Sequence, residues 1–150
     1  MTDFTPLAAK RSVSDAVIDG LIAGLVAGFA MGVFLVATGI ASGVNPLTTL
    51  ARFDPNPNSS FFSGALLHLA VSGVYGALFG LLASFQIPKI PRRPFLRLLA
   101  IGYSTILLVL ASSLIIPRTL STLAAIPILD LILGHLIYGL VLGFVFTRNR

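Results

Sequence analysis

The stretch GLIAGLVAGFAMG, residues 20–32, has a glycine at every fourth position: Gly20, Gly24, Gly28 and Gly32. Residues four apart lie on one face of a helix, so these glycines would form a single smooth stripe. In a soluble helix each glycine costs about 1 kcal/mol relative to alanine. In lipid, burying apolar side chains between helices gains little, and small residues let two backbones approach closely. The stretch therefore predicts a membrane helix that packs through its glycine face.

The composition of the whole chain agrees with a membrane location. Of 150 residues, 56% are hydrophobic and 10% are charged, and the mean hydropathy is +0.98. Soluble domains contain roughly 25% charged residues, so this chain has too little polar surface to fold in water. Cysteine is absent, which excludes disulfides, iron–sulfur clusters, c-type haem attachment and thiol nucleophiles. We expect an integral membrane protein.

Four long apolar runs predict four transmembrane helices, over about residues 15–40, 61–85, 95–116 and 126–147. A helix needs roughly 20 residues to cross about 30 Å of hydrocarbon, and backbone exposed to lipid must satisfy its own hydrogen bonds. Ser12 and Asp15 resemble a capping box at the start of the first helix. We predict an all-α fold, a bundle of four transmembrane helices, in a single membrane domain over residues 1–150.

The basic residues predict how the chain is oriented in the membrane. Two of the ten, Arg52 and Arg118, lie in the connections on one side of the membrane. The other eight lie on the opposite side, and they are Lys10, Arg11, Lys89, Arg92, Arg93, Arg97, Arg148 and Arg150. Because cytoplasmic loops carry an excess of Lys and Arg, we expect both termini in the cytoplasm. The net charge of +5 thus reflects topology, and we expect no nucleic-acid partner.

Two segments of the sequence repeat a short motif. LLHLAVSGVYGALFG, residues 66–80, and LGHLIYGLVLG, residues 133–143, each contain a histidine, then Tyr-Gly, then a further glycine. The first lies in the second span and the other in the fourth span. A duplicated helical hairpin would produce this arrangement, so we predict two repeated hairpins in the bundle.

Small residues also form stripes on the second and fourth spans. These are Gly76 and Gly80 in the second span, and Gly139 and Gly143 in the fourth span. Together with the stripe of the first span they predict a glycine zipper, in which the stripes dock against one another inside the bundle. The alternative is that the groove of the first span faces a second copy of the chain or another membrane protein.

Two histidines inside the predicted spans are the candidate functional residues. At a rise of 1.5 Å per residue, His68 would lie roughly 10 Å and His135 roughly 13 Å below the outer boundary. Each lies within two turns of a tyrosine, Tyr75 and Tyr138 respectively. Ionisable groups inside a membrane are functional candidates. One hypothesis is a haem b ligated by both imidazoles, or a quinone site. The other is that the imidazoles hydrogen-bond neighbouring helices or line a pocket for a polar small molecule.

The sequence lacks the patterns that indicate catalysis or a metal site. GxSxG, HExxH and a phosphate-binding glycine loop are absent, and so is glutamate. A zinc site requires three or four His, Cys or carboxylate ligands, and the membrane interior offers two histidines. We therefore expect no catalytic residues, no bound metal and no enzymatic activity.

The order of these motifs resembles a group of small bacterial four-helix membrane proteins, loosely YagU-like. The resemblance rests on the Gly-rich first span, on LLHLAVSGVYGALFGLL (residues 66–82), on the short Pro/Arg connection and on GHLIYGLVLGF (residues 134–144). It implies a location in the bacterial inner membrane. It implies no activity, because that group is largely of unknown function. His68, Tyr75, His135 and Tyr138 are the matching positions, and no role transfers with them.

These observations favour a non-catalytic membrane subunit or scaffold that packs through glycine stripes, as an accessory chain of a larger bioenergetic complex. The expected partners are the lipid bilayer and either other membrane subunits or further copies of the chain. Two alternatives stay open. One is a haem- or quinone-binding electron-transfer subunit that uses His68 and His135, and the other is an oligomeric small transporter or channel.

Overall fold

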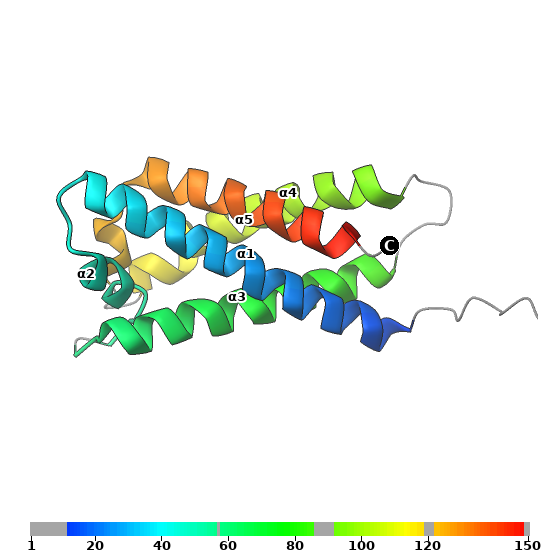
Figure 1. The fold of residues 1–150 in the computed structure, drawn as a ribbon, viewed down its shortest axis with the longest axis horizontal. Coiled ribbons are helices and arrows are strands. Elements are labelled where there is room, and N and C mark those ends of the chain that lie inside the picture. Colours follow the sequence, from blue (N-terminus) through cyan, green and yellow to red (C-terminus); the bar gives the residue numbers. More distant parts are fainter. Residues whose placement is uncertain (1–11, 57, 86–91, 119–121, 149–150) are drawn as a thin grey trace, which may run out of the picture.

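The computed structural model describes residues 12–56, 58–85, 92–118 and 122–148, and within these ranges it contains helices and no strand. Four long helices lie side by side in one bundle, with both ends of the described chain at the same end of it (Figure 1). These helices are α1 (Val13–Ala41), α3 (Phe61–Ser84), α4 (Arg92–Leu110) and α5 (Ile128–Arg148). The prediction of an all-α fold with four long apolar helices is confirmed. Lys10, Arg11, Lys89 and Arg150 lie outside the described residues.

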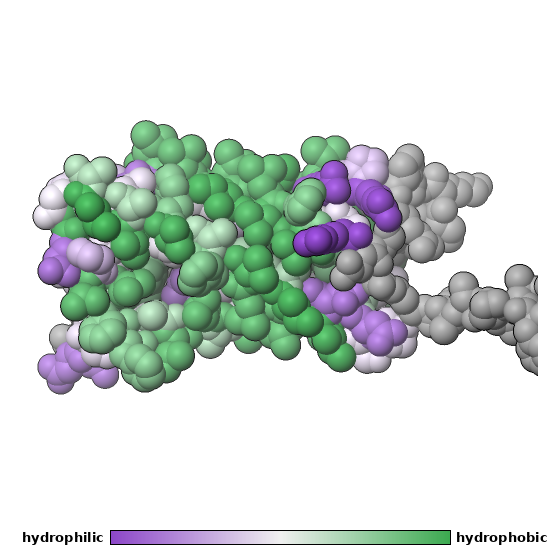
Figure 2. Space-filling model, in the orientation of Figure 1, coloured by the Kyte–Doolittle hydropathy of each residue, from purple (hydrophilic) through white to green (hydrophobic). Residues whose placement is uncertain are grey.

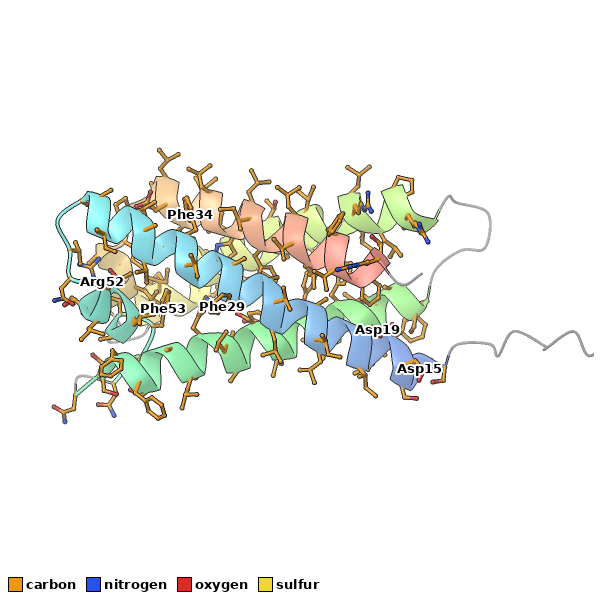
Figure 3. All side chains as sticks on the ribbon, viewed as in Figure 1. Asp15, Asp19, Phe29, Phe34, Arg52 and Phe53 are labelled. Atoms are coloured by element: carbon orange, nitrogen blue, oxygen red, sulfur yellow. The ribbon has the colours of Figure 1, made fainter. Side chains whose placement is uncertain are left out.

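The surface of the bundle is that of a multi-pass membrane protein. All four helices are long and apolar enough to cross a bilayer. Figure 2 shows a broad apolar band across the visible face, with polar residues gathered towards its ends. Asp15 and Asp19 lie at one end of the bundle and Arg52 lies at the other (Figure 3). Large apolar side chains are exposed on all four long helices, among them Phe29 and Leu98 at 65% and 70%, and an apolar surface of this extent marks contact with a membrane or a partner.

The ends of two helices show the local signals that form them. At the start of α1, the Ser12 hydroxyl accepts a hydrogen bond from the amide of Asp15, whose carboxylate accepts one from the amide of Ser12 at 2.9 Å. The predicted capping box is therefore present. A short helix that the sequence analysis missed, α2 (Pro46–Ala51), begins after Asn45, whose side-chain oxygen accepts from the amide of Leu47 at 2.8 Å.

The third span differs from its predicted form, a helix over residues 95–116. The α-helix begins at Arg92 and changes at Ala111 into a π-helical turn, η1 (Ala111–Ile115), followed by the 3₁₀ turns η2 (Ile116–Arg118) and η3 (Thr122–Ala125). The hydroxyls of Ser112 and Ser113 donate to the carbonyls of the residues four positions earlier. Such bonds compete with the helical ladder and bend a helix. The chain therefore leaves the α-helix before Pro117, which has no amide to continue it.

The packing of the helices leaves one open seam. Helix α1 packs along α3 on one side and along α5 on the other, and α4 packs along α5. Although α3 and α4 are consecutive long helices, they have few close contacts. The order around the bundle is therefore α3, α1, α5, α4, with a seam between α3 and α4. Each predicted hairpin, α1 with α3 and α4 with α5, packs as a pair.

The glycine stripe of α1 packs against α3 within the same chain. A Cβ atom built on Gly24 would lie 2.5 Å from the carbonyl oxygen of Ser72 and 2.6 Å from the Cα of Gly76. One built on Gly20 would lie 2.3 Å from the carbonyl oxygen of Gly76 and 2.9 Å from the Cα of Gly80. Glycine is required here because the two backbones touch. The stripe is covered by α3, so it is not open to a second copy of the chain.

The stripe continues towards the α2 end and has a counterpart in the second hairpin. Gly28 lies against the Ser72 side chain, and a Cβ on Gly32 would lie 3.5 Å from the His68 ring. In the second hairpin, Cβ atoms on Gly139 and Gly143 would each lie 2.9 Å from a backbone Cα of α4. In both hairpins the stripe of the second helix thus faces the first helix of the same hairpin.

Candidate functional site

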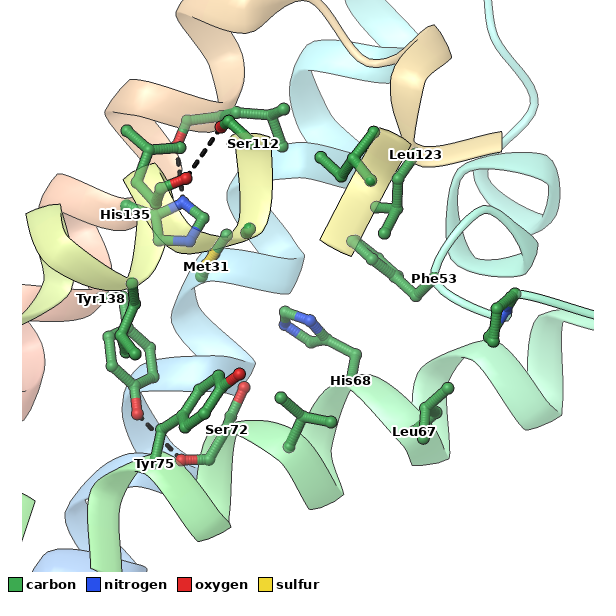
Figure 4. Close-up of a pocket in the computed structure, with 17 residues that line it drawn as sticks. Met31, Phe53, Leu67, His68, Ser72, Tyr75, Ser112, Leu123, His135 and Tyr138 are labelled. Carbon is green, nitrogen blue, oxygen red and sulfur yellow. Dashed lines mark hydrogen bonds between the residues drawn. The ribbon is translucent and has the colours of Figure 1, made fainter. Parts of the chain in front are cut away.

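A cavity of about 260 Å³ lies at the seam, in the half of the bundle that contains α2 (Figure 4). The cavity is partly open, and two of the residues that line it, Leu67 and Val71 on α3, are 39% and 41% exposed. The cavity is therefore open sideways, towards lipid. Its walls are mostly apolar, and the polar side chains among them are His68, Ser72, Tyr75, Ser112, His135 and Tyr138.

His68 enters the cavity from α3 and is held by two contacts. Its Nε2 lies 2.9 Å from the carbonyl oxygen of Gly28 on α1. Its ring stacks on the ring of Phe53 at a centroid distance of 4.4 Å and an interplanar angle of 26°. Phe53 lies two residues after the end of α2, so the segment after α2 covers this side of the cavity. The close approach at Gly28 and Gly32 brings α1 within reach of the imidazole.

His135 enters the cavity from α5, on a different wall. Its Nδ1 lies 2.8 Å from the carbonyl oxygen of Leu131, one turn earlier in the same helix. His68 and His135 are both the eighth residue of their helices, which at 1.5 Å per residue puts each roughly 10 Å from the start of its helix. The two residues thus lie at the same distance along their helices, and the two rings share one cavity.

The two hydrogen bonds determine which nitrogen of each ring carries the proton. A carbonyl oxygen can only accept, so His68 must donate from Nε2 and His135 must donate from Nδ1. In a neutral imidazole the other nitrogen carries a lone pair and is an acceptor. The cavity therefore contains two imidazole acceptors, Nδ1 of His68 and Nε2 of His135. Neither has a hydrogen-bond partner within the described residues.

Tyrosines close the end of the cavity nearer the chain termini. The Tyr138 hydroxyl donates to the carbonyl oxygen of Ser72 at 2.8 Å (Figure 4). The Tyr103 hydroxyl, from α4, donates to the carbonyl oxygen of Tyr75 at 2.9 Å. Beyond them the fully buried ring of Phe79 packs against Tyr103 at a centroid distance of 5.6 Å. This end of the seam is therefore filled by aromatic side chains.

The four residues predicted as a cofactor or polar-ligand site, His68, Tyr75, His135 and Tyr138, all line this one cavity. The side-chain hydroxyls of Tyr75 and Ser72 have no hydrogen-bond partner within the described residues. The Tyr138 hydroxyl, in contrast, donates to the main-chain carbonyl oxygen of Ser72. The eight predicted packing glycines lie at the helix contacts described above and not in the cavity wall.

The sequence analysis missed two features of the site, Phe53 and Ser112. Phe53 lies in the connection between the first two spans, where an aromatic ring between Arg52 and Asp54 is the signal that the sequence offers. Ser112 lines the cavity from η1, and its hydroxyl donates to the carbonyl of Leu108 at 2.8 Å. The Ser112–Ser113 pair five residues before Pro117 was the available signal, because hydroxyls in a membrane helix bond to the preceding turn.

Comparison with known proteins identifies a family for this chain, but that family has no known activity. No match to the chain was found among the curated proteins, and none was found among the solved structures. One family model, described as a family of unknown function (DUF6789), matches residues 14–150 and so covers all four long helices. The chain belongs to this family of unknown function, DUF6789.

Proposed function

We propose that this chain is a non-catalytic membrane protein that binds a small apolar molecule of the bilayer in the cavity between α3 and α4. The observation that carries the proposal is a cavity with apolar walls and a few polar groups, open towards lipid at the seam between the hairpins. Ligand sites have this composition, and their volumes start at about 300 Å³. A cavity of about 260 Å³ suits a single ring or head group whose chain extends into the bilayer.

We favour hydrogen bonding over haem ligation through Nε2 of His68, because that nitrogen is engaged, while the lone pairs on Nδ1 of His68 and Nε2 of His135 serve either role. Nε2 of His68 donates to the backbone of α1, and the ring stacks on Phe53. Axial ligation through that nitrogen would require His68 to give up the bond to Gly28. An organic head group can instead hydrogen-bond the imidazoles as they stand. The alternative function is that of a small transporter or channel formed by an oligomer. Measuring the flux of solutes into liposomes that contain the protein tests this alternative.

The glycine stripes support a scaffold role for the helices themselves. Because the α1 stripe packs on α3, we propose that the zipper-like contacts make a rigid frame for the cavity. Partner subunits of a bioenergetic complex would then contact the outer faces of the bundle. The basic residues and the YagU-like resemblance support a bacterial inner-membrane location with both termini in the cytoplasm.

A matched pair of valines on α3 provides the test. Val71 lines the cavity, whereas Val74 does not, and they are 41% and 56% exposed. We expect Val71→Trp to fill the cavity and Val74→Trp to leave it open. Each protein is purified in mild detergent, and the molecules that it retains are extracted and identified by mass spectrometry. A retained molecule that is lost from Val71→Trp alone supports the proposal, and equal retention by both variants contradicts it.

A further inference from the structure

We propose that the bound head group is an aromatic ring with hydroxyl substituents, of the hydroquinone class, and that the site prefers this reduced form to the oxidised quinone. The inference rests on the proposed function, because it takes the cavity as a binding site. It adds the chemical class of the ligand and the form of it that binds better.

The first step is the hydrogen-bonding character of the two imidazoles. Their N–H groups are committed to the carbonyls of Gly28 and Leu131 at 2.9 Å and 2.8 Å. An apolar cavity favours the neutral ring, because an isolated charge is costly there. Each ring therefore presents one lone pair that only a donor can satisfy. A separate backbone carbonyl binds the N–H group of each histidine and leaves the other ring nitrogen as a hydrogen-bond acceptor. The two rings therefore favour a ligand that donates hydrogen bonds.

The second step is the placement of these acceptors on different helices. His68 belongs to α3 and His135 to α5, and both line the same cavity. A hydroquinone carries its two hydroxyls at opposite sides of a rigid ring, so it can donate towards two walls at once. The quinone presents carbonyl oxygens in the same places. An acceptor placed opposite an acceptor leaves both groups desolvated and unbonded.

The remaining polar groups limit the size of the preference. The hydroxyls of Ser72 and Tyr75 have no partner within the described residues, and a hydroxyl can donate or accept. They can therefore donate to a quinone carbonyl, so the oxidised form keeps part of its affinity. We expect the reduced form to bind roughly tenfold more tightly, the effect of one net hydrogen bond.

The aromatic lining favours a flat ring over an aliphatic alcohol. The stacked pair of His68 and Phe53 lies on one side of the cavity, and Tyr75 and Tyr138 also line it. Aromatic rings pack well against one another in offset or edge-to-face contacts. A single substituted ring suits the volume of about 260 Å³. Its aliphatic chain would leave between the exposed side chains of Leu67 and Val71.

The experiment measures affinity and the state of the histidines together. The protein, labelled with ¹⁵N-histidine and held in phosphatidylcholine nanodiscs, is titrated without oxygen with decylubiquinol, decylubiquinone or 1,2-dioctanoylglycerol. The chain has two histidines, so their acceptor nitrogens give two resonances that move upfield on accepting a hydrogen bond. We expect both to move with the quinol, with roughly tenfold tighter binding than that of the quinone. We expect the weakest binding for the glycerol lipid.

His135 variants separate the role of the acceptor from folding. Its bond is made within its own helix, so replacing it leaves the contact between α1 and α3 intact. We expect His135→Leu to remove the preference for the quinol and His135→Gln, whose amide oxygen can accept, to retain part of it. If quinol and quinone bind equally without shifts of the histidine resonances, and Val71→Trp still blocks binding, the inference is wrong and the proposed function stands.

Two further outcomes have distinct meanings. Equal binding of 1,2-dioctanoylglycerol and the quinol would overturn the aromatic assignment. If no probe binds, and Val71→Trp and Val74→Trp retain the same molecules after purification, then the inference and the proposed function are both wrong.

Discussion

The hydroxyl of Tyr138 donates to the main-chain carbonyl of Ser72 at 2.8 Å and joins α5 to α3 at the closed end of the cavity. The hydroxyl of Tyr103 makes the corresponding bond from α4 to the carbonyl of Tyr75 at 2.9 Å, one turn further along α3. Side-chain bonds to helix carbonyls tie membrane helices together. These two bonds hold α3 to the second hairpin where the helices themselves have few contacts.

Replacing Tyr138 with phenylalanine removes one of these bonds and keeps the ring. Tyr138 is 3% exposed, so water cannot replace the lost partner. We expect Tyr138→Phe to lower the free energy of unfolding by about 1 kcal/mol, and Tyr103→Phe, at a half-buried site, to lower it by less. Equilibrium unfolding in mixed detergent and sodium dodecyl sulfate measures both. A Tyr138→Phe protein as stable as the wild type would contradict this role.

Adding a methyl group to the glycine stripe should separate the first hairpin. A Cβ on Gly24 would lie 2.5 Å from a carbonyl oxygen of α3, so α1 and α3 must move apart. We expect Gly24→Ala to lower the free energy of unfolding by about 2 kcal/mol, as overpacking does. The same unfolding titration measures it, and we expect no change in oligomer size by light scattering, because the stripe is internal.

Gly102→Ala is the matched control on α4. Nothing lies within 4 Å of a Cβ built there. We expect this variant to be as stable as the wild type or more stable by up to about 1 kcal/mol, the helix-propensity difference. Equal losses at Gly24 and Gly102 would show that the close packing of α1 on α3 is not what stabilises the bundle.

Thr49 offers a substitution that should stabilise the protein. It is 2% exposed, on α2, and its hydroxyl has no hydrogen-bond partner within the described residues. Valine has nearly the same shape without the polar group, so we expect Thr49→Val to raise the free energy of unfolding by about 1 kcal/mol. Thr49→Ser, which keeps the hydroxyl and loses the methyl group, should be destabilised. A lower thermal midpoint for Thr49→Val would show that its hydroxyl is satisfied.

The connection after α2 should make stability depend on pH. The Ser63 hydroxyl and the amide of Asn56 donate to the Asp54 carboxylate and lower the pKa of that carboxyl below its usual value. A carboxyl with a lower pKa in the folded chain stabilises the fold above its unfolded pKa, about 4, and this contribution is lost as the pH falls through the folded pKa. We expect Asp54→Asn to be less stable than the wild type at pH 7, and the difference to shrink towards pH 3. Unfolding titrations across this range measure it, and a difference independent of pH would contradict the effect.

The orientation of the chain can be read with single cysteines, because the natural sequence has none. Ser14 and Asn58 are exposed, and one long helix, α1, separates them. We expect an impermeant maleimide to label Asn58→Cys on intact cells and Ser14→Cys only after permeabilisation. The reverse pattern would invert the predicted orientation, and labelling of both from one side would show that α1 does not cross the membrane.

The long helices could be predicted from the sequence, because hydropathy and length decide them locally. The seam between α3 and α4 could not be predicted. Which two helices fail to pack depends on all four helices at once. The spacing of Gly20 and Gly24 predicted a packing face, but the partner helix follows only from the assembled bundle. The π-helical turn at Ala111–Ile115 has local signals in Ser112, Ser113 and Pro117, but these signals do not specify that the helix widens into a π-helical turn.

For the candidate site, the sequence predicted side chains that line one cavity, without their orientations. The helical spacing of His68 and His135 predicted similar depths, and both line the cavity. Periodicity carries no information on which carbonyl each imidazole bonds, since those partners lie on α1 for one and on α5 for the other. The stacking of Phe53 on His68 depends on how the α2 segment folds back, which no local pattern encodes.

The seam between α3 and α4 also determines what can open the cavity. The bonds from Tyr138 and Tyr103 to α3 fix one end of the seam, so widening the other end is a hinge movement of one hairpin relative to the other that breaks no hydrogen bond inside a helix. The surface that it uncovers is apolar and is wetted by acyl chains at little cost. We therefore expect the lateral pressure of the surrounding lipid to act on the cavity: tightly packed chains should narrow it, and loosely packed chains should let it widen. If the proposed ligand binds there, its occupancy should follow the physical state of the membrane as well as its concentration.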